Sequence, residues 1–166
     1  MKIYLDMDGV LCNFERRYFE LYKELPGSMR DKKEFNKNWD HFVQTKQFET
    51  LNLWPGCFDL LHVVRQYEQK GVEVEILSSS GGKKYHDEVT EQKKKWLKET
   101  GIHFKANIVS GRKNKAKYAT PDFILIDDTY DVIQSFNDAG GIGIHHKEIG
   151  NTLMLLEYVV DKQLYT

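Results

Sequence analysis

The strongest constraint on the fold is an alternation of short apolar runs with helical segments. Short stretches rich in apolar residues predict β-strands at residues 3–5, 72–77, 106–109, 123–126 and 142–145. Segments at 14–24, 56–70, 86–100, 113–119, 130–138 and 151–162 lie around and between them, and several carry apolar residues at helical spacing. This alternation predicts parallel βαβ units. We therefore expect an α/β fold, a doubly wound and mainly parallel sheet of about five strands with helices on both faces.

One stretch departs from the alternation. Residues 31–53 are polar and carry scattered aromatic residues, so they predict short helices and loops instead of sheet. A chain of 166 residues has the length of one domain with a small insertion. We expect residues 1–166 to form a single domain with a helical cap at about 15–54. Trp39, Phe42 and Phe48 are expected to form the core of that insertion.

Polar residues follow three of the predicted strands directly. They are Asp6-Met7-Asp8-Gly9, Ser78-Ser79 and Asp127-Asp128. In a parallel sheet, ligands bind beyond the carboxyl ends of the strands, so these residues should converge. Four crowded carboxylates need a cation, and a hard divalent ion such as Mg²⁺ suits oxygen ligands. Asp6, Asp8, Asp127 and Asp128 are therefore the predicted metal site.

The predicted site has the residue types that phosphoryl transfer needs. Asp6 can attack phosphorus as a nucleophile, and Asp8 can exchange a proton with the leaving oxygen and with water. Gly9 permits a tight backbone path after the strand. The Ser78 hydroxyl and nearby amides can hold phosphate oxygens. A lysine can neutralise the charge that develops; we favour Lys115, with Lys113 and Lys117 as alternatives.

The ordered motifs resemble those of the haloacid dehalogenase superfamily. An apolar strand followed by DMDGVL, a strand followed by SS, a lysine, and a strand followed by DD occur in that order. Within the superfamily, five pieces look like the 5′(3′)-deoxyribonucleotidases: the sequence DMDGVLCNF, the segment Trp54–Gly56, the SSS loop at 78–80, the helix containing Lys93-x-x-Trp96, and ILIDD. Ser78 stands where the animal enzymes usually carry threonine, and Thr129-Tyr130 where Arg-Pro is usual.

This resemblance implies a Mg²⁺-dependent phosphatase that dephosphorylates (deoxy)nucleoside monophosphates through an aspartyl-phosphate. It implies a Rossmann-like fold, with Asp6 as the nucleophile and Asp8 as the acid and base. Within the last acidic pair, Asp128 is the favoured metal ligand. The phosphate would contact Ser78, Ser79 and Lys115, and the base would stack on Phe14. The alternative for Phe14 is that it anchors the cap to the core.

Other functions stay open at this point. A phosphatase for another small phosphomonoester, such as a sugar phosphate, would use the same motifs. A signalling receiver also gathers carboxylates, a hydroxyl and a lysine, but its acidic pair lies on the first strand, whereas here the pair comes last. A phosphate-binding pseudoenzyme lacks support, because every catalytic motif is present.

Several other residues predict no function. Lys93, Lys94 and Lys95 are expected on a solvated helix face. His145-His146 should not form a metal pair, because adjacent strand residues point to opposite faces. Cys12 lies near the site, but nothing nearby would activate its thiol.

Composition bounds the partners and the setting. The formal net charge of −1 does not suggest a nucleic acid polymer or an anionic membrane as partner. Two cysteines without CxxC spacing, and Asp6 and Asp8 within the apolar N-terminal stretch, predict a cytoplasmic protein without a signal peptide. The expected partner is a small phosphomonoester; a homodimer is left open.

Overall fold

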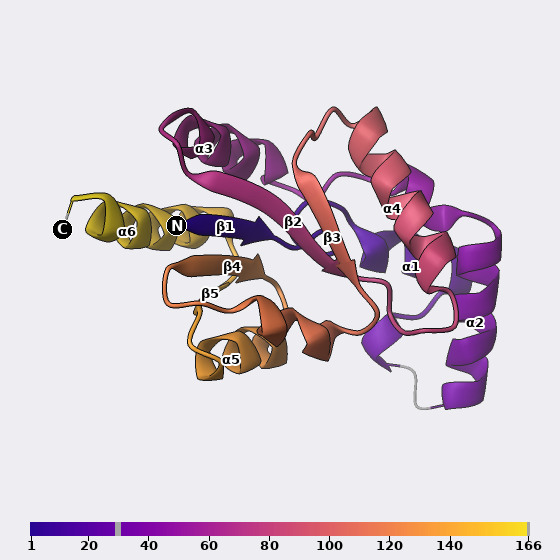
Figure 1. Ribbon diagram of the computed structural model, residues 1–166. Helices are drawn as coiled ribbons and strands as arrows, with labels where there is room; N and C mark the ends of the chain where they lie inside the picture. Colours follow the sequence, from indigo (N-terminus) through magenta and orange to yellow (C-terminus); the bar gives the residue numbers. More distant parts are fainter. Residues whose placement is uncertain (29–30, 166) are drawn as a thin grey trace.

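A computed structural model describes residues 1–28 and 31–165. Its described part contains a five-stranded parallel sheet in the order β3-β2-β1-β4-β5 (Figure 1). The strands are β1 (Lys2–Leu5), β2 (Glu73–Ser79), β3 (Lys105–Val109), β4 (Phe123–Asp127) and β5 (Ile142–His145). The expected α/β fold is confirmed.

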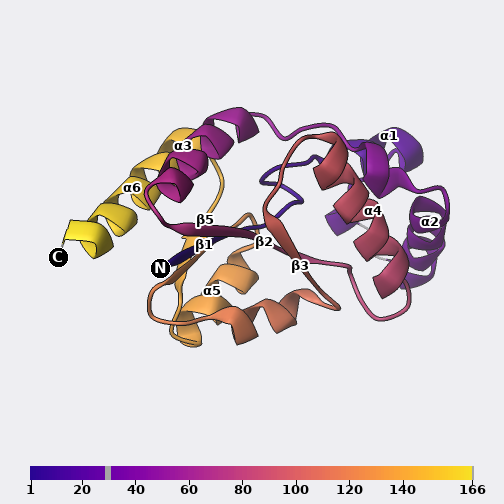
Figure 2. The ribbon, with the colours of Figure 1, turned by 45° about the horizontal axis from the view of Figure 1, so that its top comes forward.

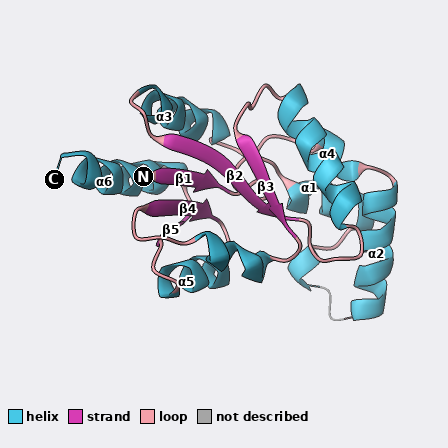
Figure 3. Ribbon diagram, in the orientation of Figure 1, coloured by secondary structure: helices cyan, strands magenta, loops and turns pink. Residues whose placement is uncertain are grey.

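Helices cover both faces of the sheet (Figure 3). Side chains alternate along β1, so Ile3 and Leu5 face one layer and Tyr4 faces the other. The first layer contains α3 (Cys57–Gln69), α4 (His86–Glu99) and α6 (Ile149–Tyr165), and the second contains η3 (Arg112–Tyr118) and α5 (Tyr130–Asp138). β1 and β4 are buried on both faces, which explains their continuous apolar runs, whereas β2 begins with alternating valine and glutamate residues.

The strand order places β1 at the centre of the sheet. Ile3 aligns with Val74 of β2 on one side and with Ile124 of β4 on the other. The chain fills the sheet from β1 outward in one direction with β2 and β3, then in the other with β4 and β5. Between β1 and β4 the winding reverses, which is where α/β sheets bind ligands. The Asp6 amide donates to the Ile126 carbonyl at 3.0 Å and extends the pairing toward this point.

An insertion follows β1 and lies beyond the carboxyl ends of the strands (Figures 1 and 2). It contains α1 (Phe14–Tyr22), η1 (Pro26–Ser28), α2 (Lys32–Gln44) and η2 (Gln47–Thr50). Asn13 caps α1 by accepting from the Arg16 amide at 3.1 Å, and Asp31 caps α2 through the Lys33 amide at 2.9 Å. The sequence predicted only short helices here, but α2 is a regular helix of 13 residues.

The two connections of the insertion to the sheet run side by side. Cys12 and Leu53 form an antiparallel bridge. The Asn13 amide donates to the Asn52 carbonyl at 2.8 Å, and the Trp54 amide donates to Leu11 at 2.8 Å. The chain therefore enters and leaves the insertion through one stem.

Aromatic residues form the interior of the insertion. Tyr18, Phe42 and Phe48 are buried, as predicted for Phe42 and Phe48. Trp39 is only half-buried and lines a cavity, so its predicted core position is only partly correct. The insertion also contacts α4, because the Trp96 indole donates to the Leu51 carbonyl at 2.8 Å and Gln92 Nε2 donates to the Val43 carbonyl at 2.8 Å.

Candidate active site

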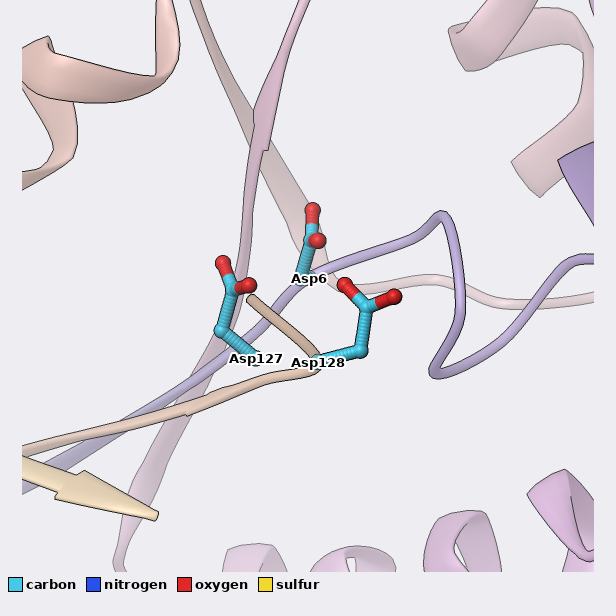
Figure 4. Close-up of side chains that lie close together, drawn as sticks. All are labelled: Asp6, Asp127 and Asp128. Atoms are coloured by element: carbon cyan, nitrogen blue, oxygen red, sulfur yellow. The ribbon is translucent and has the colours of Figure 1, made fainter. Parts of the chain in front are cut away.

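Three carboxylates meet at the ends of β1 and β4 (Figure 4). Asp6 directly follows β1, Asp127 is the last residue of β4, and Asp128 follows it. One oxygen of each lies within 4.8 Å of the others. The convergence expected from the parallel sheet is therefore present for these three aspartates.

Lys115 projects from η3 into this group. Its buried ammonium lies 2.9 Å from Asp6 Oδ1 and 2.6 Å from Asp127 Oδ2. Burial alone would lower the Lys115 pKa, but the charges of Asp6 and Asp127 overcome this and raise it. Lys113 and Lys117 are exposed. Of the three lysines considered from the sequence, Lys115 is the one held against the carboxylates.

The acidic groups repel one another in spite of Lys115. Burial, and then the charge of Asp127, raises the pKa of Asp6 to about 7. Partial desolvation of the Asp128 carboxyl by the surrounding protein, followed by the charges of Asp127 and Asp8, raises the pKa of Asp128 to about 6. A bound cation would relieve this repulsion.

Those residues fit a hard divalent cation. Both Asp127 oxygens are engaged, one by Lys115 and the other by the Thr129 amide at 2.9 Å. Asp128 is exposed, and the one hydrogen bond that its carboxylate accepts within the described residues comes from the Thr129 hydroxyl at 3.3 Å. Asp6 and Asp128 thus keep more oxygen lone pairs for a metal than Asp127 does.

Gly9 allows the Asp128 carboxylate to approach the loop after β1. Its φ is +79°, and a Cβ at this position would collide with the Asp128 carboxylate. The sequence predicted a tight backbone path at Gly9, and the structure adds a reason, the space needed by Asp128.

Lys93 is a site residue that the sequence interpretation missed. It was expected on a solvated face, but its side chain is buried. Its ammonium donates to Asp8 Oδ2 at 2.7 Å, to Ser78 Oγ at 2.8 Å and to the Ser79 carbonyl at 2.8 Å. All three ammonium protons are used, so Lys93 fixes the loop after β1 relative to the end of β2. Lys94 and Lys95 are exposed, as expected.

The two serines after β2 occupy different positions. Ser79 lines the cavity above the carboxylates, and its hydroxyl accepts from the Gly81 amide at 3.1 Å. Ser78 is fully buried behind it, with its oxygen accepting from Lys93. Because that oxygen accepts from an ammonium, the Ser78 hydroxyl proton must point elsewhere.

The cavity that holds these groups has a volume of about 550 Å³. Asp6, Asp8, Ser79 and Lys115 lie on its polar side. Its other walls come largely from the insertion and its stem: Phe14, Glu15, Pro26, Trp39, Phe48 and Trp54. This size suits a small-molecule ligand, with polar groups at one end and aromatic rings at the other.

Three other residues stay outside the catalytic group. His145 Nε2 bonds the Asp128 carbonyl at 2.9 Å, whereas His146 is buried and bonds Thr152 Oγ1 at 2.7 Å. The described residues contain no metal-binding cluster that includes either histidine. Burial, followed by the charge of Asp8, raises the pKa of the Cys12 thiol well above its ordinary value, so this thiol is not activated.

A parallel sheet with three aspartates and a lysine gathered at the ends of β1 and β4 has the features of an α/β phosphatase. The sequence profile of the family described as "5′ nucleotidase, deoxy (Pyrimidine), cytosolic type C protein" matches residues 1–152. The chain belongs to this family.

One solved structure agrees with this chain on the fold, and a second is less similar. A hydrolase from Streptococcus pneumoniae TIGR4 superposes with a TM-score of 0.52 and 18% identity, covering 96% of this chain and 97% of that one. A haloacid dehalogenase family enzyme from Bacteroides thetaiotaomicron has a TM-score of 0.44 and 15% identity, covering 88% and 93%. A search of curated proteins gave no match.

Proposed function

We propose that this protein hydrolyses (deoxy)nucleoside monophosphates through an aspartyl-phosphate on Asp6. The observation that carries the proposal is the placement of Asp6 at the cavity wall, 2.9 Å from the Lys115 ammonium, with Asp8 two residues further along the same wall. A nucleophile, a cation and a proton donor thus share one cavity.

The proposed reaction has two steps. In the first, an Asp6 oxygen bonds to phosphorus while the ester oxygen leaves and takes a proton from Asp8. In the second, water attacks the same phosphorus, Asp8 accepts its proton, and inorganic phosphate leaves as Asp6 is restored. Lys115 would stabilise the negative charge on the transferring phosphoryl group, and Ser79 would orient its oxygens. Ser78 is buried behind Ser79, outside the cavity lining, and would hold the Lys93 ammonium in place instead of touching the phosphate.

We propose Mg²⁺ as the cofactor, held by Asp6, the Asp8 carbonyl and Asp128, with Asp127 engaged by Lys115 instead. When bound, it would supply charge neutralisation between the nucleophile, the phosphate and the acidic pair. Burial, and then the charges of neighbouring carboxylates, raises the pKa values of Asp6 and Asp128, and a cation would favour the ionised form of both groups.

The insertion would act as the cap that recognises the nucleoside. Phe14 lines the cavity eight residues after Asp6 and is half-buried, which leaves part of its ring available. It also packs in parallel on Phe48, with ring centroids 5.7 Å apart, so it anchors the cap as well. Stacking of a base on an aromatic ring is worth about 1–3 kcal/mol.

A panel of phosphomonoesters with Mg²⁺, read by phosphate release, tests the function. We expect deoxynucleoside monophosphates to be preferred over sugar phosphates. Phe14→Ala should lower kcat/KM for a nucleotide by roughly ten- to a hundredfold, in line with the stacking energy. The same change should leave a small aryl phosphate almost unaffected. Equal losses on both substrates would assign Phe14 to anchoring only, and a preference for sugar phosphates would refute the nucleotide assignment.

The partner in this proposal is a small molecule and not a nucleic acid polymer or a membrane. The described residues contain no helix long and apolar enough to span a bilayer. The family description includes the word cytosolic, which supports a cytoplasmic setting for this chain. A homodimer remains compatible with the proposal.

A further inference from the structure

A second cavity lies next to the catalytic one, and one side chain separates them. The second cavity has a volume of about 330 Å³ and lies between α2 and the loop after β2. Its walls include Phe35, Asn36, Lys83 and Tyr85. Trp39 and Gly81 line both cavities, so they form the partition.

The partition is a close contact between the insertion and the sheet. Gly81 has φ +86°, and a Cβ there would lie 2.7 Å from Trp39 Cζ2 and 3.1 Å from Cη2. The indole therefore reaches the Gly81 backbone with its far edge, and only glycine leaves room for it. Lys84 pairs with Asp40 at 3.0 Å beside this contact, joining the same two segments.

Neighbouring rings hold Trp39 in place. Its ring lies nearly parallel to Phe35, with centroids 6.3 Å apart, and to Phe42, at 6.4 Å. It meets Phe48 edge to face at 5.6 Å. A side chain packed on several sides is a rigid wall and not a mobile surface group.

We infer that Trp39, seated on Gly81, is a specificity-determining residue that limits the length of the substrate. The phosphate end of the catalytic cavity is fixed by Asp6 and Ser79. In this proposal a mononucleotide occupies the cavity of about 550 Å³ up to Trp39, whereas the second nucleotide of a dinucleotide would need the space beyond the indole. Opening the partition would join the second cavity, whose aromatic rings and lysines suit another nucleotide. This inference rests on the proposed function and deepens it.

The test compares a deoxynucleoside 5′-monophosphate with a dinucleotide carrying the same 5′-phosphate, and includes p-nitrophenyl phosphate as a small reference. The wild type should favour the mononucleotide. Trp39→Ala should raise the dinucleotide-to-mononucleotide ratio of kcat/KM at least about tenfold, a change of the size that pocket shape controls. Activity on p-nitrophenyl phosphate is measured beside it, so that any general loss of activity in the variant is separated from the change in the ratio.

Two further variants make the test decisive. Trp39→Phe keeps an aromatic ring in the stack but is too short to reach Gly81, so it should shift the ratio in the same direction even if Trp39→Ala folds poorly. Phe19→Ala removes an exposed aromatic ring from the same insertion, outside both cavities, and should leave the ratio unchanged.

The outcomes separate this inference from the proposed function. An active wild type that already accepts the dinucleotide, or a ratio that neither Trp39 variant moves, would overturn the inference alone. A wild type that cleaves aryl phosphates but no nucleotide would refute the nucleotide assignment. In that case a short and a long aryl phosphate replace the nucleotide pair, and the same shift in ratio supports the partition. Inactivity on every phosphomonoester would overturn both.

Discussion

Asp6 is buried at the wall of the cavity, and the Lys115 ammonium joins its carboxylate to that of Asp127. Asp6→Asn keeps the shape of the side chain but removes its nucleophilic oxygen. We expect phosphatase kcat to fall at least about a thousandfold while the protein stays folded, because loss of a nucleophile removes most of the rate enhancement. Steady-state kinetics and circular dichroism measure the two effects.

Asp161→Asn is the matched control for this substitution, since Asp161 is an exposed aspartate on α6, away from the cavity. It should leave kcat unchanged. Activity of Asp6→Asn within tenfold of the wild type would contradict the assignment of Asp6.

Lys93 offers a second test at the scale of a single residue. Lys93→Met keeps most of the apolar stem but removes the ammonium that bonds Asp8, Ser78 and Ser79. Because buried acceptors lose their donor, the free energy of unfolding should fall by about 1–3 kcal/mol. We also expect kcat to fall roughly ten- to a hundredfold, since Asp8 loses its positioning, with KM changed less than about threefold.

Thermal unfolding and kinetics of Lys93→Met are compared with those of Lys94→Met, the exposed neighbour on the same helix. The Lys94 variant should resemble the wild type in both measurements. If kcat of Lys93→Met is unchanged while stability falls, Lys93 is structural only and does not position the acid.

At the scale of elements, β1 and β4 bring acidic residues together. The free energy of unfolding of the protein should therefore depend on pH and on bound metal. In metal-free protein the pKa values of Asp6 and Asp128 rise from 3.8 to about 7 and about 6. Raised pKa values mean that the folded state binds protons more tightly than the unfolded state. The stabilisation that the Asp6 and Asp128 carboxyl groups contribute is therefore complete below about pH 4. It is lost as the pH rises through 6 to 7.

Magnesium should reverse this loss, because protons and the cation compete for the same oxygens. At a hundredfold excess over Kd, a ligand stabilises by about 2.7 kcal/mol, or roughly 5–10 °C in Tm for a domain of this size. We expect that rise at pH 8 and a much smaller one at pH 5, measured by thermal unfolding in Mg²⁺ and in EDTA. Asp128→Asn should abolish more of this rise in Tm than Asp127→Asn does. The reverse order would make Asp127 the metal ligand in place of Asp128.

The strands and helices could be predicted from the sequence, because stretches rich in apolar residues alternate with polar segments. The strands, the flanking helices and the convergence of Asp6 with the last acidic pair all follow from local pattern and parallel topology. Lys93 was not predictable from its lysine-rich surroundings, since tertiary packing decides which lysine is buried. A signal was nevertheless present: Lys93 lies four residues after Val89 and three before Trp96, both expected to face inward. Trp39 could not be placed, because its partner Gly81 is distant in the sequence.

At the scale of the molecule, the cavity exists only where the insertion and the α/β sheet meet. One wall comes from the strand ends and the other from the aromatic rings of the insertion. Hydrogen bonds from Trp96 and Gln92 on α4 to the backbone of the insertion join the two parts. Buried apolar residues of both parts belong to one continuous core cluster. We therefore expect the insertion and the sheet to unfold together, as small single domains usually do.

Phe42→Ala tests this cooperativity, because Phe42 is fully buried in the insertion, with 0% exposure. Truncating a buried phenylalanine costs about 3–5 kcal/mol. If the two parts form one unit, this loss should lower the stability of the whole protein and leave a single transition. Tryptophan fluorescence and far-ultraviolet circular dichroism should then give the same midpoint in urea. Phe19→Ala, an exposed aromatic truncation in the same insertion, should change stability by no more than about 0.5 kcal/mol. Two separate transitions, with the circular dichroism midpoint close to that of the wild type, would instead show that the insertion melts alone while the sheet stays folded.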